Sequence, residues 1–309
     1  MTRIAIIGSG VAGLSCARRL ADAGLRAVVL DKGRGIGGRV ATRRADPDMQ
    51  FDHGAQHIKA TNPAFEAVLE QAKESGALAR WSLCDGTTRY VGTPGMTGFA
   101  KFLGQGIDIR QKTEVTALSS GDRGWDVQIG DTFETYDIVA STIPSPQAEA
   151  LVGTHLPAAF DTVRYDPCLT LMVGLTTPPD LPVTATNPTD AFGWTARDSA
   201  KPGRPEAECW VAQANPDWSV AHLEYSKNDI CALMLAPFLE HAGLSAPDVA
   251  YASAHRWRYA QVATPLGASF VSNKGGTLYA GGDWCLGSKV EHAWQSGTAM
   301  ADDMLTRLS

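Results

Sequence analysis

The sequence lacks several features that define whole classes of protein. No run of about eighteen apolar residues occurs, and the apolar stretch in MTRIAIIGSG is too short for a signal sequence, so neither a membrane span nor secretion is predicted. Basic residues are in deficit, with 27 Lys and Arg against 33 Asp and Glu and a net charge of −6. That balance argues against broad nucleic-acid binding. We expect a soluble, cytoplasmic protein.

Paired cysteines are missing too. The pattern is typical of free thiols in a reducing compartment and argues against a disulfide framework or a metal site, because no Cys-x-x-Cys pair occurs among Cys16, Cys84, Cys168, Cys209, Cys231 and Cys285. Without disulfides, the fold must depend on an apolar core. A 309-residue chain that is 44% hydrophobic can bury enough surface to enclose a cofactor, and its length favours two domains.

The order of apolar runs and turns predicts the organisation of the chain. Residues 4–7 are predicted as a buried strand, a helix follows and stops at Gly24, and residues 27–30 form the next strand. Strands are also expected in EVTAL, GWDVQIG and YDIVAST, and the last of these ends before two prolines. The stretch from 146 to 270 differs in character, and within it TNPTD and SAKPGRPEAE predict surface loops.

The first turn carries a nucleotide-binding motif. GSGVAG at 8–13 fits G-x-G-x-x-G between a predicted strand and a predicted helix, and Asp31 ends the next strand. Gly8 permits the tight turn, Gly10 lets a pyrophosphate approach the backbone, and Gly13 lets helix and strand pack closely. The helix start offers N–H groups and about half a positive charge to phosphates. Asp31 is expected to accept both ribose hydroxyls of an adenosine, which argues against a 2′-phosphate there.

A second half-site is predicted near the carboxyl end. GGDWCLGSKVEHAWQSG at 281–297 combines a glycine pair, an acid and a helix start, and Ser288 with Glu291 matches the S-x-x-E capping box. An apolar stripe at helical spacing follows, formed by Val290, Ala293, Trp294, Gly297, Met304 and Leu308. A plain capped helix packed on a sheet would also account for these residues.

Two further motifs carry a resemblance to a known family. Gly37-Gly38-Arg39 follows Asp31, and Gly54-Ala55-Gln56-His57 follows another short apolar run. With the two glycine motifs above, these segments resemble the flavin-dependent amine oxidase superfamily. The resemblance implies FAD, with Arg39 meeting the pyrophosphate bidentately and the positive end of the last helix facing the N1–C2=O edge of the flavin. The FAD is expected to be noncovalent, because Cys285 does not sit where covalent monoamine oxidases carry their link.

The resemblance implies an α/β fold, with a Rossmann-type FAD-binding domain of the amine oxidase and p-hydroxybenzoate hydroxylase kind and a second, mixed-sheet substrate domain. We assign residues 1–58, 97–145 and 268–309 to the first domain, and 59–96 and 146–267 to the second. The expected cofactor contacts are Gly8, Gly10, Val11, Ala12, Gly13, Asp31, Lys32, Gly38, Arg39, Gly54, Ala55, Gln56, His57, Val115, Gly282, Asp283, Val290 and Glu291.

Within the superfamily the chain is similar to the bacterial renalases over almost its full length, notably in GTPGMTGFAKFL and WRYAQV. This implies an oxidase that takes hydride from 2-dihydro and 6-dihydro isomers of NAD(P) to flavin N5, releasing NAD(P)+ and, with dioxygen, hydrogen peroxide. Such a dihydropyridine regains aromaticity on losing hydride, so no general acid or base is expected. Candidate residues of the substrate pocket are His57, Trp194, Arg258 and Tyr259. Each also has an ordinary structural interpretation, and Met96 is expected to pack in the core.

Two alternatives remain open from the sequence. One is a flavin amine oxidase, or another FAD-dependent oxidoreductase or desaturase with a different hydride donor. The other is a nonenzymatic flavoprotein that senses redox state. The sequence leaves open the preferred isomer, NAD against NADP, and the oligomeric state. The expected partners are a nicotinamide dinucleotide and dioxygen, with neither nucleic acid nor membrane.

Overall fold

The computed structural model describes residues 2–45, 48–83, 88–156 and 160–309. A six-stranded sheet forms one half of the molecule, in the order β17-β18-β11-β1-β2-β7. Its pairs are parallel except for β17 with β18. The strands are β1 (Ile4–Ile7), β2 (Ala27–Leu30), β7 (Asp108–Arg110), β11 (Ile138–Ser141), β17 (Val271–Ser272) and β18 (Leu278–Ala280). Continuous apolar runs such as β1 suit a parallel sheet that is buried on both faces.

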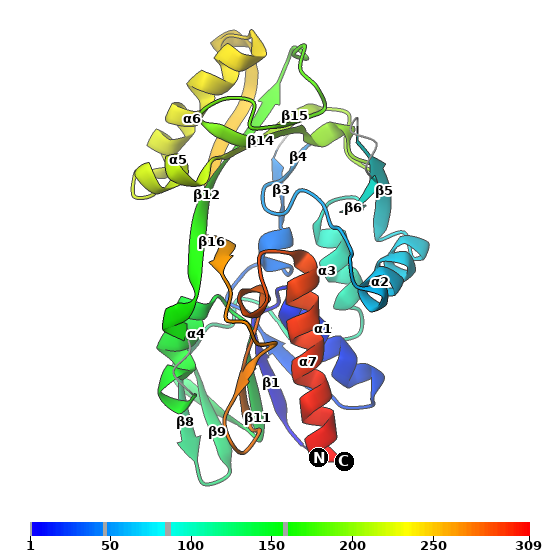
Figure 1. Ribbon diagram of the computed structural model, residues 1–309, viewed down its shortest axis with the longest axis vertical. Helices are drawn as coiled ribbons and strands as arrows, with labels where there is room; N and C mark the ends of the chain where they lie inside the picture. The colour runs from blue at the N-terminus through cyan, green and yellow to red at the C-terminus, as the bar shows by residue number, and fades with distance from the viewer. Residues whose placement is uncertain (1, 46–47, 84–87, 157–159) are drawn as a thin grey trace.

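Three helices pack beside this sheet: α1 (Val11–Asp22), α3 (Thr97–Leu103) and the final α7 (Val290–Leu308). Helices α1 and α7 lie side by side, as Figure 1 shows. Gly297 permits their close approach, because a Cβ there would lie 2.0 Å from the Ala12 carbonyl oxygen. Residue 297, about two turns into α7, is thereby placed against the start of α1, although almost the whole chain separates them in sequence.

A small antiparallel sheet and a short helix complete this half. The sheet contains β8 (Val115–Gly121), β9 (Gly124–Ile129) and β10 (Thr132–Tyr136), and α4 (Ser145–Val152) packs against β8. Val127 and Ala148 share one buried cluster with Ala5 of β1, so the small sheet is part of the same core. The sequence runs EVTAL, GWDVQIG and YDIVAST are strands, as predicted.

The other half is built on a five-stranded antiparallel sheet of order β13-β14-β15-β12-β16. Its strands are β13 (Thr184–Thr186), β14 (Phe192–Arg197), β15 (Glu208–Ala214), β12 (Arg164–Leu175) and β16 (Val249–Thr264). Helices α5 (Pro216–Ala221) and α6 (Lys227–Ala242) cover one face, where they bury an apolar cluster that includes Leu171 and Phe238. The opposite face is turned to β4, with Met172 and Val211 packed on Phe51.

Two hairpins and a helix fill the region between the sheets. These are β3 (Thr42–Ala45) with β4 (Met49–Asp52), β5 (Leu78–Ser82) with β6 (Thr88–Gly92), and α2 (Pro63–Glu74). The long strands β12 and β16 extend from the second sheet toward the first, and both chain termini lie at the far end of the first half (Figure 1). The domain boundaries assigned from the sequence stay a prediction.

Local predictions at the start of the chain are confirmed. Strands β1 and β2 have the predicted bounds, and Gly24 adopts φ +83° just past the end of α1, where a left-handed residue ends the helix. Met96 is fully buried in the core. The described cysteines are free thiols, and Cys84 lies outside the described residues. In the part of the chain that the structure describes, none of the helices has the length and apolar character needed to cross a bilayer.

Two predictions for the last helix are wrong. Leu308, the last residue of α7, does not join the buried face of the helix and is 42% exposed. The capping box does not form either. The N-cap residue is Lys289 rather than Ser288, and no side chain caps the helix, because the Glu291 carboxylate is bound to another segment.

Candidate functional site

The first glycine turn has the geometry expected of a nucleotide-binding turn. Gly8 has φ +105°, and a Cβ at Gly13 would lie 2.0 Å from the Gly8 carbonyl oxygen, so both glycines are required for the close packing of β1 and α1. Gly10 differs, because a Cβ there would meet no atom within 4 Å. The turn is thus tight on its protein side and open at Gly10, which is where a ligand would approach backbone N–H groups at the start of α1.

Asp31 lies beside this turn at the end of β2. Its Oδ2 accepts hydrogen bonds from the backbone N–H and the hydroxyl of Ser9, each at 2.6 Å, and its Oδ1 accepts from the Gly33 N–H at 2.6 Å. An ionised carboxylate has about four acceptor sites. Asp31 therefore fixes the turn and keeps room for about one further donor. The neighbouring Lys32 is directed to Glu114 at 3.7 Å, on the surface.

The segment 37–39 lies directly against the first turn. The Gly37 N–H donates to the Ser9 carbonyl at 2.8 Å, and a Cβ at Gly38 would be 3.4 Å from the Gly10 Cα. Gly54 approaches the same place, because its Cβ would lie 2.0 Å from the Arg39 carbonyl oxygen. We call residues 8–13, 37–39 and 54 the cradle. Three motifs separated in sequence are thus brought together, as predicted, and glycine backbone makes their contacts.

Arg39 and Asp283 are also brought together. Arg39 Nη2 donates to Asp283 Oδ1 at 2.6 Å, and its Nη1 donates to the carbonyls of Tyr259 and Ala260 at 3.2 Å. Most of the guanidinium fork is therefore engaged by protein acceptors. Its bidentate contact with a pyrophosphate stays a prediction, and the structure adds a link from the cradle to the carboxyl-terminal half-site.

The carboxyl-terminal half-site is held by polar contacts of α7. The Gly282 N–H donates to Ser296 Oγ at 2.9 Å. Glu291 is almost fully buried and accepts from the N–H and hydroxyl of Thr61 at 2.9 and 2.8 Å, and from the Asn62 N–H. Burial alone raises the pKa of Glu291, but these hydrogen bonds hold it below its usual range. Glu291 therefore anchors the start of α7 to the segment before α2.

Two further cofactor candidates, Val290 and Val115, and the nearby Cys285 are buried or partly buried. Val290, the first residue of α7, is partly buried and packs with Val11 in one cluster. Val115 begins β8 and is partly buried on the core beneath the sheet. Cys285 is fully buried, and burial raises the pKa of its thiol to about 12, so the thiol stays protonated and unreactive at neutral pH.

Gln56 has a role inside its own loop. Its Nε2 donates to the carbonyls of Asp52 and Gly54, and its Oε1 accepts from Lys201 Nζ at 3.2 Å. Both amide hydrogens are therefore engaged within residues 52–56, and the side chain is buried. Gln56 holds the loop in shape, and Ala55 joins the loop to the cradle by donating its N–H to the Arg39 carbonyl at 2.8 Å.

A buried charge cluster supports this loop. Lys201 Nζ lies 2.6 Å from Asp198 Oδ1 and 3.4 Å from Asp52 Oδ2, and Arg204 binds Asp52 as well. All four side chains are at most 1% exposed. Burial alone raises the pKa of Asp52, but Lys201 and Arg204 hold it below its usual range, whereas burial and the Asp52 charge raise the pKa of Asp198.

This cluster corrects a prediction. The stretch SAKPGRPEAE, at 199–208, was expected to be a surface loop, yet Lys201 and Arg204 within it are buried. Two carboxylates from β4 and from the turn at Asp198–Ala200 neutralise them, which makes their burial possible. The sequence signal was an acid followed by bases three and six positions later, in DSAKPGR.

A line of side chains crosses the five-stranded sheet on the face turned to residues 53–57. Trp194 pairs with Gln213 across β14 and β15, Gln213 with Thr170 of β12, and Thr170 with His255 of β16. Directly paired residues project to the same face. We call these four residues the sheet row. Sequence reasoning included Trp194 but missed the other three, because strand register decides their alignment.

Contacts connect the sheet row to the loop at 53–57. Gln213 Nε2 donates to the Gly54 carbonyl at 2.8 Å. The rings of His53 and His255 are 4.8 Å apart, Trp257 stacks on His53 at 5.3 Å, and its Nε1 donates to the His53 carbonyl at 2.7 Å. Burial lowers the pKa of both histidines to about 4, so both rings are neutral at neutral pH.

The four candidate pocket residues are only partly brought together. His57 and Trp194 have ring centroids 6.0 Å apart, and the buried Arg89, which sequence reasoning missed, lies 3.3 Å from His57 Nε2. Tyr259 instead packs on Tyr165 at 5.4 Å. Arg258 projects to the other side of its strand, where it binds the Glu224 carboxylate at 2.7 and 3.0 Å.

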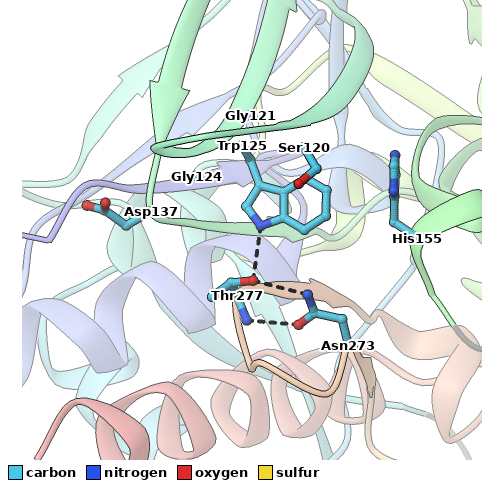
Figure 2. Close-up of a pocket in the computed structure, with 8 residues that line it drawn as sticks. All are labelled: Ser120, Gly121, Gly124, Trp125, Asp137, His155, Asn273 and Thr277. Carbon is cyan, nitrogen blue, oxygen red and sulfur yellow. Dashed lines mark hydrogen bonds between the residues drawn. The ribbon is translucent and has the colours of Figure 1, made fainter.

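A hollow of about 310 Å³ lies elsewhere on the surface, and its lining is shown in Figure 2. Trp125 Nε1 donates to Thr277 Oγ1 at 3.2 Å, and Asn273 Oδ1 accepts from the Thr277 N–H at 2.9 Å. The Asp137 carboxylate accepts from the Arg3 N–H at 2.6 Å. These lining groups are engaged in holding the turn before β18, and none of the predicted site residues lines the hollow.

Comparison with known families agrees with this geometry. Residues 6–72 match the model of an NAD(P)-binding Rossmann-like domain, and residues 73–305 match that of the flavin containing amine oxidoreductases. The second match alone covers well over half of the chain. The boundary between the matches falls inside α2, beyond the cradle segments.

Solved structures share the fold at low sequence identity. A protein named as a protoporphyrinogen oxidase, from Exiguobacterium sp. 255-15, superposes with a TM-score of 0.79 at 13% identity, over 98% of this chain and 98% of that chain. A wild-type putrescine oxidase bound to putrescine superposes with a TM-score of 0.72 at 14% identity, over 99% of each chain. At such identities the likeness shows the fold alone.

Proposed function

The chain belongs to the family of flavin containing amine oxidoreductases and binds FAD, and from that premise we propose that it oxidises the 2-dihydro and 6-dihydro isomers of NAD(P). The products are NAD(P)+ and, with dioxygen, hydrogen peroxide. The similarity of GTPGMTGFAKFL and WRYAQV to the bacterial renalases supports this substrate class. So do the neutral, partly aromatic groups of the sheet row.

The residues of the cradle fit FAD. Gly10 is open where a pyrophosphate would approach, and Asp31 keeps capacity for one further donor such as a ribose hydroxyl. The start of α7 is held by Glu291, and its first residue, Val290, packs in the cluster that contains Val11 of α1. We propose that the cradle binds the adenosine and pyrophosphate of FAD, and that Gly282, Asp283 and the start of α7 meet its ribityl chain and ring.

The proposed reaction requires no acid or base from the protein side chains. When bound, FAD supplies the hydride acceptor and passes the two electrons to dioxygen, which also takes one proton from solvent. The dihydropyridine loses hydride and becomes aromatic, so no protein group has to remove a proton. The chain's residues then bind the planar ring, orient it and exclude water. Neutral His53 and His255 are suited to that task, because they add no positive charge beside a ring that becomes cationic.

The observation that carries the proposal is the character of the sheet row. Trp194, Gln213, Thr170 and His255 present an aromatic and uncharged surface to the loop at 53–57. An amine substrate in its ordinary ammonium form would be favoured by a carboxylate in this row, and the row has none. A planar, uncharged dihydropyridine matches it better.

Rapid anaerobic mixing tests the proposal. The FAD-loaded protein is mixed with each of the 2-dihydro and 6-dihydro isomers of NAD and NADP, and absorbance near the flavin maximum is followed. We expect bleaching within seconds, then recovery of the absorbance and formation of peroxide when dioxygen is admitted. Unchanged absorbance with every isomer would overturn the proposal.

The same experiment separates the alternatives. Bleaching by amines, with release of ammonia and an aldehyde, would identify an amine oxidase. A flavin that no donor of either class reduces would favour the redox-sensing interpretation. Ordinary 4-dihydro NADH and NADPH serve as the matched control, and we expect slower reduction with them than with the isomers.

A further inference from the structure

Two properties of the sheet row make it a candidate surface for a ligand. Its side chains are polar or aromatic and uncharged, whereas the other face of the same strands is apolar and covered by α5 and α6. Trp194, Gln213 and His255 are also partly exposed, while Thr170 between them is buried. Their partial exposure shows that solvent reaches Trp194 and Gln213 on the inner strands β14 and β15, and His255 on the edge strand β16. Gln213 and His255 also contact the loop at 53–57 directly.

Gln213 has a fixed orientation within the sheet row. Its Nε2 donates to the Gly54 carbonyl at 2.8 Å, so the amide nitrogen faces the loop. Among the described residues, no donor is bound to its Oε1, which is not shut off from solvent. An amide held by one end in this way presents a single acceptor at a defined position.

His255 supplies the complementary group on the other side of Thr170. Neither ring nitrogen has a hydrogen-bond partner in the described part of the chain, and neither is sealed from solvent. The ring sits edge-on to His53, with centroids 4.8 Å apart. Gln213 and His255 therefore both converge on residues 53 and 54, one from each side of Thr170.

We infer that Gln213 and His255 bind the carboxamide of the dihydronicotinamide ring. Gln213 Oε1 accepts an N–H of the carboxamide, and the His255 ring donates to its carbonyl oxygen. This assignment rests on the proposed function and deepens it, because it names the groups that distinguish nicotinamide from other hydride donors. A primary carboxamide carries both a donor and an acceptor, and the two residues supply the matching pair.

The protonation state of His255 agrees with this role. Burial, the neighbouring His53 and the charges of Lys227 and Arg43 lower its pKa to about 4. The ring is therefore neutral in the pH range in which an enzyme would work, with one N–H donor and one acceptor nitrogen. Trp194, beside Gln213, completes the row with a ring face on which a planar group can stack.

An analogue that lacks one half of the carboxamide tests the assignment. In the 3-acetylpyridine analogue of the dihydro dinucleotide, a methyl ketone keeps the carbonyl oxygen but loses both N–H donors. We expect the wild-type kcat/KM for this analogue to be about 10-fold lower than for the nicotinamide compound, as for one lost hydrogen bond with a partner left unsatisfied.

Variants at the two positions give different expected results. Gln213→Leu should lower kcat/KM for the nicotinamide compound about 10-fold and bring the ratio between the two substrates close to one. His255→Leu should lower kcat/KM for both substrates by a similar factor, because both carry the carbonyl. Gln261→Leu, at an exposed position of the same sheet, is the matched control and should change neither value.

The FAD content and absorption spectrum of each variant are measured first, since Gln213 also contacts Gly54. If Gln213→Leu does not retain FAD, the wild type decides the question through binding of NAD+ and 3-acetylpyridine dinucleotide, followed by the perturbation of the flavin spectrum. Equal affinities there, or an unchanged substrate ratio in a loaded Gln213→Leu, would overturn the assignment while leaving the oxidase function intact. Absence of flavin reduction by every isomer would overturn both.

Discussion

The cradle and the sheet row face the same loop but are built in different ways. The cradle is made of backbone, because its three segments meet through glycines whose Cβ atoms would collide with neighbouring carbonyl groups at Gly13 and Gly54. The row is made of side chains from four strands, and strand register alone aligns them. The cradle therefore depends on glycine motifs that are visible in the sequence, and the row depends on the pairing of strands.

This difference teaches where specificity can vary in the family. The cradle is a backbone surface, and at Gly13 and Gly54 a side chain would collide with a neighbouring carbonyl group. A row of side chains on a sheet can be altered one residue at a time without moving the strands. We therefore expect substitutions in the cradle to affect FAD retention, and substitutions in the row to affect substrate preference.

The largest effect should come from the charge cluster that holds the loop between the two surfaces. Lys201→Met removes one base and leaves Asp198 and Asp52 with Arg204 alone. Breaking such a buried arrangement costs about 3–5 kcal/mol. We expect a lower free energy of unfolding in urea by that amount. Lys73→Met, which removes a partly exposed ion pair with Glu70, is the control and should have little effect. Equal stability of the two variants would contradict the role of the cluster.

The contrast between glycine motifs and paired strands also explains which parts of the site the sequence could predict. The first glycine turn was predictable, because Gly8, Gly10, Gly13 and Asp31 lie at fixed spacing within a single strand-turn-helix-strand unit. The contact of Gly37 with Ser9 was not predicted, although both residues lie in motifs that carry the family resemblance. The overall class of fold was predictable for the same reason.

The remaining features depend on pairings that no local pattern specifies. Thr170, Gln213 and His255 become neighbours only when β12, β15 and β16 adopt their register. Lys201 was misplaced on the surface because its carboxylate partner Asp52 lies far away in sequence. Glu291 matched a capping pattern, yet the N–H groups of Thr61 and Asn62 bind it instead.

A second test measures how the free energy of unfolding depends on pH through His53 and His255. His53 is neutral in the folded protein with a pKa of about 4, against about 6.5 when unfolded, so the unfolded chain binds more protons between these values. Stability should therefore fall as the pH drops from 6.5 to 4, by an amount on the order of 3 kcal/mol from His53 and a smaller, solvent-screened part from His255. His53→Gln should flatten the urea-unfolding free energy across this window. An identical slope in wild type and variant would refute the assignment.

The predicted contact of Asp31, beside the cradle, with the ribose of FAD is tested by removing its carboxylate. Asp31→Ala should weaken FAD binding about 10- to 100-fold, since a hydrogen bond to a charged group contributes about 1.5–3 kcal/mol. Asp31 also holds Ser9, so Ser9→Ala is the matched control, because it removes the hydroxyl contact but keeps the carboxylate. FAD content after dialysis, and the dissociation constant from flavin fluorescence, measure both. Equal retention by Asp31→Ala and wild type would contradict the ribose contact.

The smallest effect is expected at Arg258, which the sequence made a candidate for the substrate pocket. The structure directs its guanidinium to Glu224 on the surface, with 43% of the Arg258 side chain and 70% of the Glu224 side chain exposed. Water and salt screen such a pair, so it contributes little to stability. We expect Arg258→Ala to leave both the urea midpoint and the KM for a dihydro dinucleotide within experimental error, whereas His255→Leu, three positions earlier on the same strand, raises that KM. A clear rise in KM for Arg258→Ala would mean that the arginine leaves Glu224 when substrate binds, and the substrate surface would then extend beyond the sheet row to the opposite side of β16.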